Sequence, residues 1–251
     1  VVNAYNTLIA AADGVGTVAP ATAGVTSSNV NSLLSAVGVG SGSLPSTTDG
    51  KALLADVIDN ALASAVDTPD ELTKMAEAAA RVQALAAQNA GDTPATPGLT
   101  QEDLKTLGVP NTASMTADQL AAAVAAIQAA AAADANSLAE VKDIVAKAVD
   151  ALTKIGAFAQ DQSTGVGSNV DSSSTPAGLS NGTTGGTSGT PTAADYAAAG
   201  VTGVTSANVA AINAALQSAG ITQSNTHNPT AIQAVVNAYN TLIAAADGVG
   251  T

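Results

Sequence analysis

His227 is the residue best suited to acid–base or metal chemistry, and the chain has no other histidine. A Ser-His-Asp triad would need it, but the low complexity of the surrounding sequence argues against such a triad. His227 lies in the stretch SNTHNP, directly before Asn228 and an expected helix. We interpret it as a polar loop residue beside the helix cap, with a pH-sensitive interface contact as the alternative.

Two acidic pairs could act as catalytic carboxylates, Asp70 with Glu71 and Glu102 with Asp103. Each pair falls in the first turn of an expected helix. Negative charge is favourable there because the helix dipole places a partial positive charge at that end. We therefore predict a structural role for both pairs.

Four aspartates lie near glycine-rich breaks, where carboxylates could bind Ca²⁺: Asp13, Asp161, Asp171 and Asp247. No EF-hand loop or calcium-binding nonapeptide repeat surrounds them. Cysteine is absent from the chain, which removes thiolate metal sites, disulfides and cysteine nucleophiles. The sequence thus predicts no catalytic, cofactor-binding or metal-binding residues and no enzyme, with Ca²⁺ binding as the alternative for these aspartates.

The formal net charge of −13 over 251 residues disfavours nucleic acid, which requires clustered Lys and Arg. It also disfavours an anionic membrane surface, and no apolar run reaches the roughly 18 residues of a membrane span. Repeated acidic surfaces would keep a long polymer soluble and self-repelling.

The supply of apolar residues favours thin helical bundles. Hydrophobic residues make up 46% of the chain, yet it has only three Tyr and one Phe. Cores must therefore be built from Ala, Val, Leu and Ile, which bury little area per contact. We predict an all-α fold of small three-helix bundles joined end to end.

The ends of the sequence carry the strongest signal, because residues 1–17 (VVNAYNTLIAAADGVGT) recur unchanged as residues 235–251. The offset, 235 − 1 = 234, predicts a 234-residue repeat followed by the start of the next. The second copy belongs to a helix expected over 228–248, so the first copy is expected to lie inside such a helix too. We expect the chain to be a segment of a longer tandem array.

A shorter sequence pattern recurs inside this repeat, in the stretches GVTSSNV (24–30), SMTADQL (114–120) and GVTGVTSANV (200–209). Apolar residues at spacings of three and four follow each stretch, which predicts amphipathic helices. The pattern predicts Thr26, Thr116 and Thr205 as their N-caps.

Other helices complete the expected modules. Short helices are predicted at 100–109 and 192–201, each with a Thr cap and a C-terminal glycine, Gly108 or Gly200. Longer helices are predicted at 51–66, 69–88, 138–158 and 228–246. The predicted parts are the end of a preceding helix (1–17), module 1 (18–90), module 2 (91–160), a Gly/Ser/Thr-rich linker or arm (161–191) and module 3 (192–251).

The order of short helix, Gly-Val, second helix and long helix resembles the GA-like three-helix modules found in tandem in the extension regions of giant bacterial surface adhesins, including biofilm and RTX-type adhesins. The resemblance lies in TAADYAAAGVTGVTSANVAAINAAL (192–216) with AIQAVVNAYNTLIAAADG (231–248), and more loosely in 100–158. It implies a very long exported protein of the bacterial cell surface that takes part in attachment. The layout is also similar to albumin-binding bundles, but an exposed aromatic and aliphatic patch is not evident here.

Three functions follow as expectations. The first is a structural repeat that acts as stalk or spacer, with adjacent identical repeats as its partners. The alternative is a self-assembling filament or sheath with contacts between neighbouring chains, and the third is a host-protein binding module.

Overall fold

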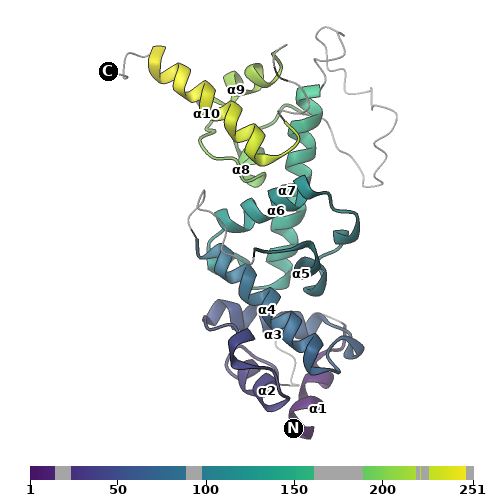
Figure 1. The fold of residues 1–251 in the computed structure, drawn as a ribbon. Helices are drawn as coiled ribbons and strands as arrows, with labels where there is room; N and C mark the ends of the chain where they lie inside the picture. Colours follow the sequence, from purple (N-terminus) through teal and green to yellow (C-terminus); the bar gives the residue numbers. More distant parts are fainter. Residues whose placement is uncertain (15–23, 89–97, 161–188, 219–220, 222–225, 247–251) are drawn as a thin grey trace. The chain divides into compact units, whose positions relative to one another are not determined.

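The computed structural model describes residues 1–14, 24–88, 98–160, 189–218, 221 and 226–246, and all regular elements within these ranges are helical (Figure 1). The all-α class is confirmed, whereas the tandem arrangement of three-helix bundles stays a prediction. The chain divides into two compact units, unit 1 (Val1–Ala146) and unit 2 (Lys147–Thr251), and this division falls inside helix α7 (Leu138–Gln160).

Unit 1 contains most of the helices and one continuous apolar core. Its elements are α1 (Val2–Ala11), α2 (Val30–Ala36), η1 (Ser41–Ser43), α3 (Thr48–Asn60), η2 (Ala63–Ala65), α4 (Pro69–Ala86), α5 (Gln101–Thr106), η3 (Thr112–Ser114), α6 (Ala117–Ala129), η4 (Ala132–Ala135) and the start of α7. A single cluster of buried side chains extends from α1 to the start of α7.

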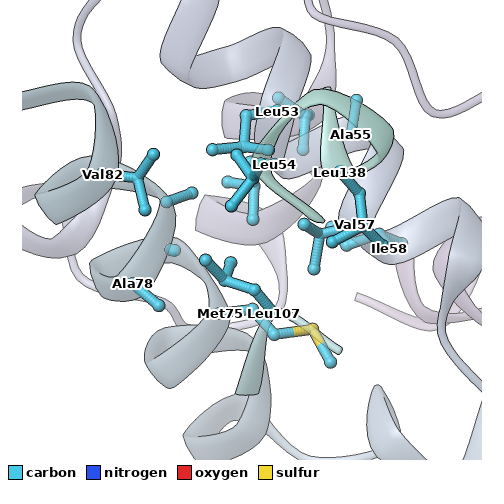
Figure 2. Close-up of a cluster of buried hydrophobic side chains, with 14 of the residues drawn as sticks. Leu53, Leu54, Ala55, Val57, Ile58, Met75, Ala78, Val82, Leu107 and Leu138 are labelled. Carbon is cyan, nitrogen blue, oxygen red and sulfur yellow. The ribbon is translucent and has the colours of Figure 1, made fainter. Parts of the chain in front are cut away.

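The centre of this core lies between α3 and α4, as Figure 2 shows with Leu54, Ile58 and Met75. Leu54 and Ile58 are fully buried, and so are two alanines of α4, Ala78 and Ala79. The small alanine side chains on α4 leave room for the leucine and isoleucine side chains of α3 to pack against this helix.

Unit 2 contains the later part of α7 with α8 (Ala193–Ala198), α9 (Val209–Leu216) and α10 (Pro229–Ala246). The largest buried side chain is that of Tyr196. Its hydroxyl donates to Asn213 Oδ1 at 2.6 Å, and Asn213 Nδ2 donates to the Pro191 carbonyl at 2.8 Å. Burial raises the pKa of Tyr196, and the negative charge of Asp195 raises it further. The phenol therefore stays protonated and keeps this buried bond.

The short helices α5 and α8 are built alike. Each starts at a capping box, in which Thr100 pairs with Asp103 and Thr192 with Asp195. Both aspartates also pair with a cation from another helix, Asp103 with Arg81 of α4 and Asp195 with Lys154 of α7.

Both short helices also end alike, at glycines with φ of +84° (Gly108) and +76° (Gly200). The predicted Thr caps and terminal glycines of both helices are thereby confirmed. Because a side chain disfavours this left-handed conformation, glycine suits the position after the helix.

The other predicted caps and ends give a mixed result. Thr116 caps α6 as predicted, but Thr26 and Thr205 are not N-caps, because α2 and α9 begin one turn later at Asn29 and Asn208. In both places the asparagine Oδ1 accepts a bond from the threonine backbone N–H, at 2.8 and 2.6 Å, which closes a turn before the helix. The expected helix over 51–66 instead runs from Thr48 to Asn60 and is followed by η2.

Of the predicted linker 161–191, residues 161–188 lie outside the described residues. A second, shorter break is predicted from the sequence at 89–98, and its residues 89–97 also lie outside the described residues.

Candidate functional site

Several of the residues weighed for chemistry have structural partners in the described parts of the chain. His227 is exposed, and its Nε2 lies 2.8 Å from Asn228 Nδ2. Glu71 belongs to the capping box of α4, where the Thr68 hydroxyl donates to it and lowers its pKa. Glu102 pairs with Lys105 on the surface at 3.2 Å. These contacts explain why helix starts are acidic without requiring catalysis.

Of the four aspartates considered for Ca²⁺, only Asp13 lies within the described residues. Asp13 is exposed and pairs through its backbone with Leu62, while Asp161, Asp171 and Asp247 lie outside the described residues. No group of three candidate metal ligands forms within the described ranges. Residues 178–182 (GLSNG) match the Gly-x-Ser-x-Gly pattern of a nucleophile turn. They also lie outside the described residues, and the sequence predicts no strand directly before them and no helix directly after them.

The strongest candidate for function is the repeated segment itself, which occurs as α1 and as the later part of α10. The internal geometry of the two copies agrees. Thr7 Oγ1 donates to the Asn3 carbonyl at 2.9 Å, and Thr241 Oγ1 donates to the Asn237 carbonyl at the same distance. The two copies therefore form the same helix and differ in what surrounds them.

One side of this helix, here named the leucine face, is covered in the first copy and uncovered in the second. Its members are Ala4, Leu8, Ala11 and Ala12 in the first copy, and Ala238, Leu242, Ala245 and Ala246 in the second. Leu8 is 0% exposed, whereas Leu242 is 67% exposed. In the second copy all four residues are exposed.

The other side, here named the valine face, shows the reverse. It consists of Val236 and Asn240 in the second copy and of Val2 and Asn6 in the first. Val236 is 0% exposed, whereas Val2 is 70% exposed. Positions two residues apart, such as 240 and 242, are separated by about 200° around a helix, so the two faces lie on opposite sides.

Among the described elements of unit 1, α2, α3 and η2 make the main contacts with the first copy. The helix end is fixed by backbone pairing, since Gly14 N–H donates to the Ala61 carbonyl at 2.9 Å and Asp13 forms a bridge with Leu62. Leu8 and Ala4 join the buried cluster of unit 1. We name α2, α3 and η2 the acceptor surface.

The second copy is held by α9 and by the segment before it. Asn240 Nδ2 donates to the Gly203 carbonyl at 3.1 Å, and Asn240 Oδ1 accepts from Asn208 Nδ2 at 3.0 Å. Two turns earlier, Gln233 accepts from Thr202 N at 2.7 Å and donates to the Thr202 carbonyl at 3.0 Å. Polar bonds thus surround the buried Val236.

Closely related turns contact the helix in both units. Residues 24–30 read GVTSSNV and residues 203–209 read GVTSANV. A Cβ on Gly24 would lie 3.7 Å from Thr7 Cγ2, and one on Gly203 would lie 3.2 Å from Asn240 Nδ2. Nearly identical turns therefore approach the same helix sequence at neighbouring positions.

The repeat is evident from the sequence, but the exchange of faces was not predicted from it. The available signal was the presence of apolar residues on two sides of the repeated helix, with Val236 on one side and Ala238, Leu242 and Ala245 on the other.

No protein-family model matches this sequence, and neither a curated protein nor a solved structure was found to be similar to it. In the described ranges, none of the helices has both the length and the apolar character needed to cross a bilayer.

Proposed function

We propose that this chain contains one 234-residue structural repeat of a long tandem array, which acts as a stalk or spacer in a bacterial extracellular adhesin or fibre. The observation that carries the proposal is that one helix sequence buries its leucine face in unit 1 and its valine face in unit 2. In an array, the second copy of one repeat is the first copy of the next. A single helix then has both faces covered.

The mechanism is mechanical. Units of a repeat protein are stabilised by their own cores and by interfaces with their nearest neighbours. A helix that supplies Val236 to one unit and Leu242 to the next couples the two without a separate linker. Such a protein projects whatever lies at its far end, and its length follows from the number of repeats.

Composition and resemblance support the remaining parts of the proposal. The charge of −13 over the 251 residues gives an array of such repeats a self-repelling surface, which suits an extended polymer. The extracellular location and the role in attachment rest on the resemblance of residues 192–216 and 231–248 to the GA-like modules of surface adhesins.

Small-angle scattering of chains with one, two and four repeats tests the proposal. We expect the largest dimension to grow by a constant step per repeat, with every sample monomeric at low and high concentration. Particles whose largest dimension stops growing as repeats are added would contradict a stalk.

The junction has its own test, in a chain of two repeats. There, Leu242→Ala at the internal junction should destabilise the following unit, because the same residue is the Leu8 equivalent of that unit. In the single-repeat chain the substitution should have no such effect.

The exposed leucine face favours a second candidate, a self-assembling filament or sheath. Leu242 is 67% exposed, and neighbouring chains could cover it. Scattering then gives masses that rise with concentration at every repeat number.

A further inference from the structure

We propose that the leucine face of α10 is a docking surface for a second copy of this chain, and that it binds the acceptor surface of that copy in place of α1. The inference rests on the proposed function in taking α1 and α10 as two copies of one junction helix. It adds that the junction can form between separate molecules.

The occupant is identified by residue-for-residue identity with a helix already seated in the structure. The acceptor surface buries Leu8 completely, with Ala4 at 7% exposure and Ala11 at 2%. The second copy presents the same side chains in the same order, and its Leu242 is 67% exposed. A surface that holds α1 is therefore complementary to α10.

Docking leaves the attachment of α10 to its own unit intact. The contacts of the second copy in unit 2 use Val236 and Asn240, which lie about 120° and 160° around the helix from Leu242. One helix can hence bind both units at once. Because the docking surface and the acceptor surface are different patches, the contact is head-to-tail and builds rings or open chains of molecules.

The balance between α1 and α10 is set by effective concentration. The two helices make the same contacts, and α1 is attached to its own unit, which corresponds to roughly millimolar local concentration for a short connection. The unaltered chain therefore stays monomeric at micromolar concentration. A substitution that weakens α1 alone shifts the balance towards α10 of another molecule.

Leu8→Ala is that substitution, because it removes the leucine from α1 and leaves Leu242 in place. Loss of a buried leucine weakens seating by about thirtyfold or more. In analytical ultracentrifugation we expect the mass of the Leu8→Ala chain to rise with concentration in the tens of micromolar. The unaltered chain and Leu242→Ala stay monomeric, and the double variant, Leu8→Ala with Leu242→Ala, loses the association.

Mixing gives a discrete complex. The double variant can accept a helix but cannot donate a functional one, while the unaltered chain can donate and has its own acceptor surface filled. We expect these two proteins to form a 1:1 complex, and the Leu242→Ala chain to form none with the double variant.

If Leu8→Ala unfolds unit 1, the milder Leu8→Val variant replaces it. We expect the Leu8→Val chain to associate as well, and to associate more than the unaltered chain. If Leu8→Ala and Leu8→Val remain monomeric up to millimolar concentration, or if the double variant associates as strongly as Leu8→Ala, the inference is wrong. The junction test within a covalent two-repeat chain is independent, so it can succeed when docking between molecules fails.

Discussion

The two copies of residues 1–17 place one amino-acid sequence in two environments within one chain. In unit 1 the helix is held by apolar packing of its leucine face, with Leu8 fully buried. In unit 2 it is held by Val236 together with polar bonds from Asn240 to Gly203 and Asn208. The difference shows that the helix has two binding faces, and that its neighbours decide which one is used.

This comparison also explains why a repeat boundary can lie within a helix. A helix with one apolar stripe serves one core. A helix with apolar residues on opposite sides can serve two cores at once, and a shared element of this kind links the stabilities of adjacent units.

The largest expected effect comes from the leucine face. Leu8→Ala should destabilise unit 1 by about 2–5 kcal/mol, because it leaves a cavity in a close-packed core. Leu242→Ala removes the same side chain from an exposed position and should change stability by less than about 0.5 kcal/mol. Hydrogen exchange of peptides from each unit measures both effects, at a concentration where the chain is monomeric. Equal effects at both positions would show that Leu242 is also buried.

The valine face should give the opposite order. Val236→Ala should cost unit 2 about 1.5–3 kcal/mol, the free energy of burying a valine side chain. Val2→Ala, at a position that is 70% exposed, should cost less than about 0.5 kcal/mol. The measurement is urea unfolding, monitored through hydrogen exchange of the same peptides from each unit. If Val2→Ala proves the more damaging of the two, the assignment of faces is reversed.

Local features of the fold could be predicted from sequence because the interacting residues are close together in the chain. A Thr followed three residues later by an Asp predicts the starts of α5 and α8, and Gly108 and Gly200 predict their ends. The same reasoning failed at Thr26 and Thr205. There an asparagine three residues later bonds the threonine backbone and delays the helix by one turn.

The candidate site could be located from sequence but not interpreted. The identity of residues 1–17 and 235–251 points to the helix, yet no local rule can assign different burial to Leu8 and Leu242, whose neighbours in sequence are the same. Their environments depend on residues far along the chain, in α2 and α3 for the first copy and in α9 for the second. The periodicity of apolar residues in the sequence does not reveal tertiary contacts of this kind.

A smaller effect is expected at the polar part of the valine face. Asn240→Ala removes the bonds to Gly203 and Asn208 and should cost unit 2 about 1 kcal/mol. Asn6→Ala is the matched control, because Asn6 is exposed in the first copy and should tolerate the change. Thermal unfolding of the two variants separates them. A cost at Asn6 as large as that at Asn240 would mean that unit 1 also uses this face.

The smallest expected effect is a pH dependence of the stability of unit 2, which comes from Asp195 in the capping box of α8. Burial raises the pKa of Asp195, but hydrogen bonds from Lys154 and from the Thr192 backbone and hydroxyl outweigh it, so the pKa lies below its usual value. The unfolded chain therefore takes up the proton first on acidification. Stability from Asp195 is fully present above the unfolded pKa of about 3.9 and is lost as pH falls through the folded pKa.

Asp195→Asn should accordingly cost unit 2 about 0.3–1 kcal/mol at pH 7, since the aspartate interacts with both the helix dipole and Lys154. The difference from the unaltered chain should shrink as pH falls below about 4, because the native carboxylate is then protonated as well. Urea unfolding at several pH values measures this, with the exposed Asp150 of α7 as the control position for Asp→Asn. A cost that stays constant down to pH values far below the unfolded pKa would show that it does not come from the negative charge of Asp195. The pairing with Lys154 would then contribute little to holding unit 2 together.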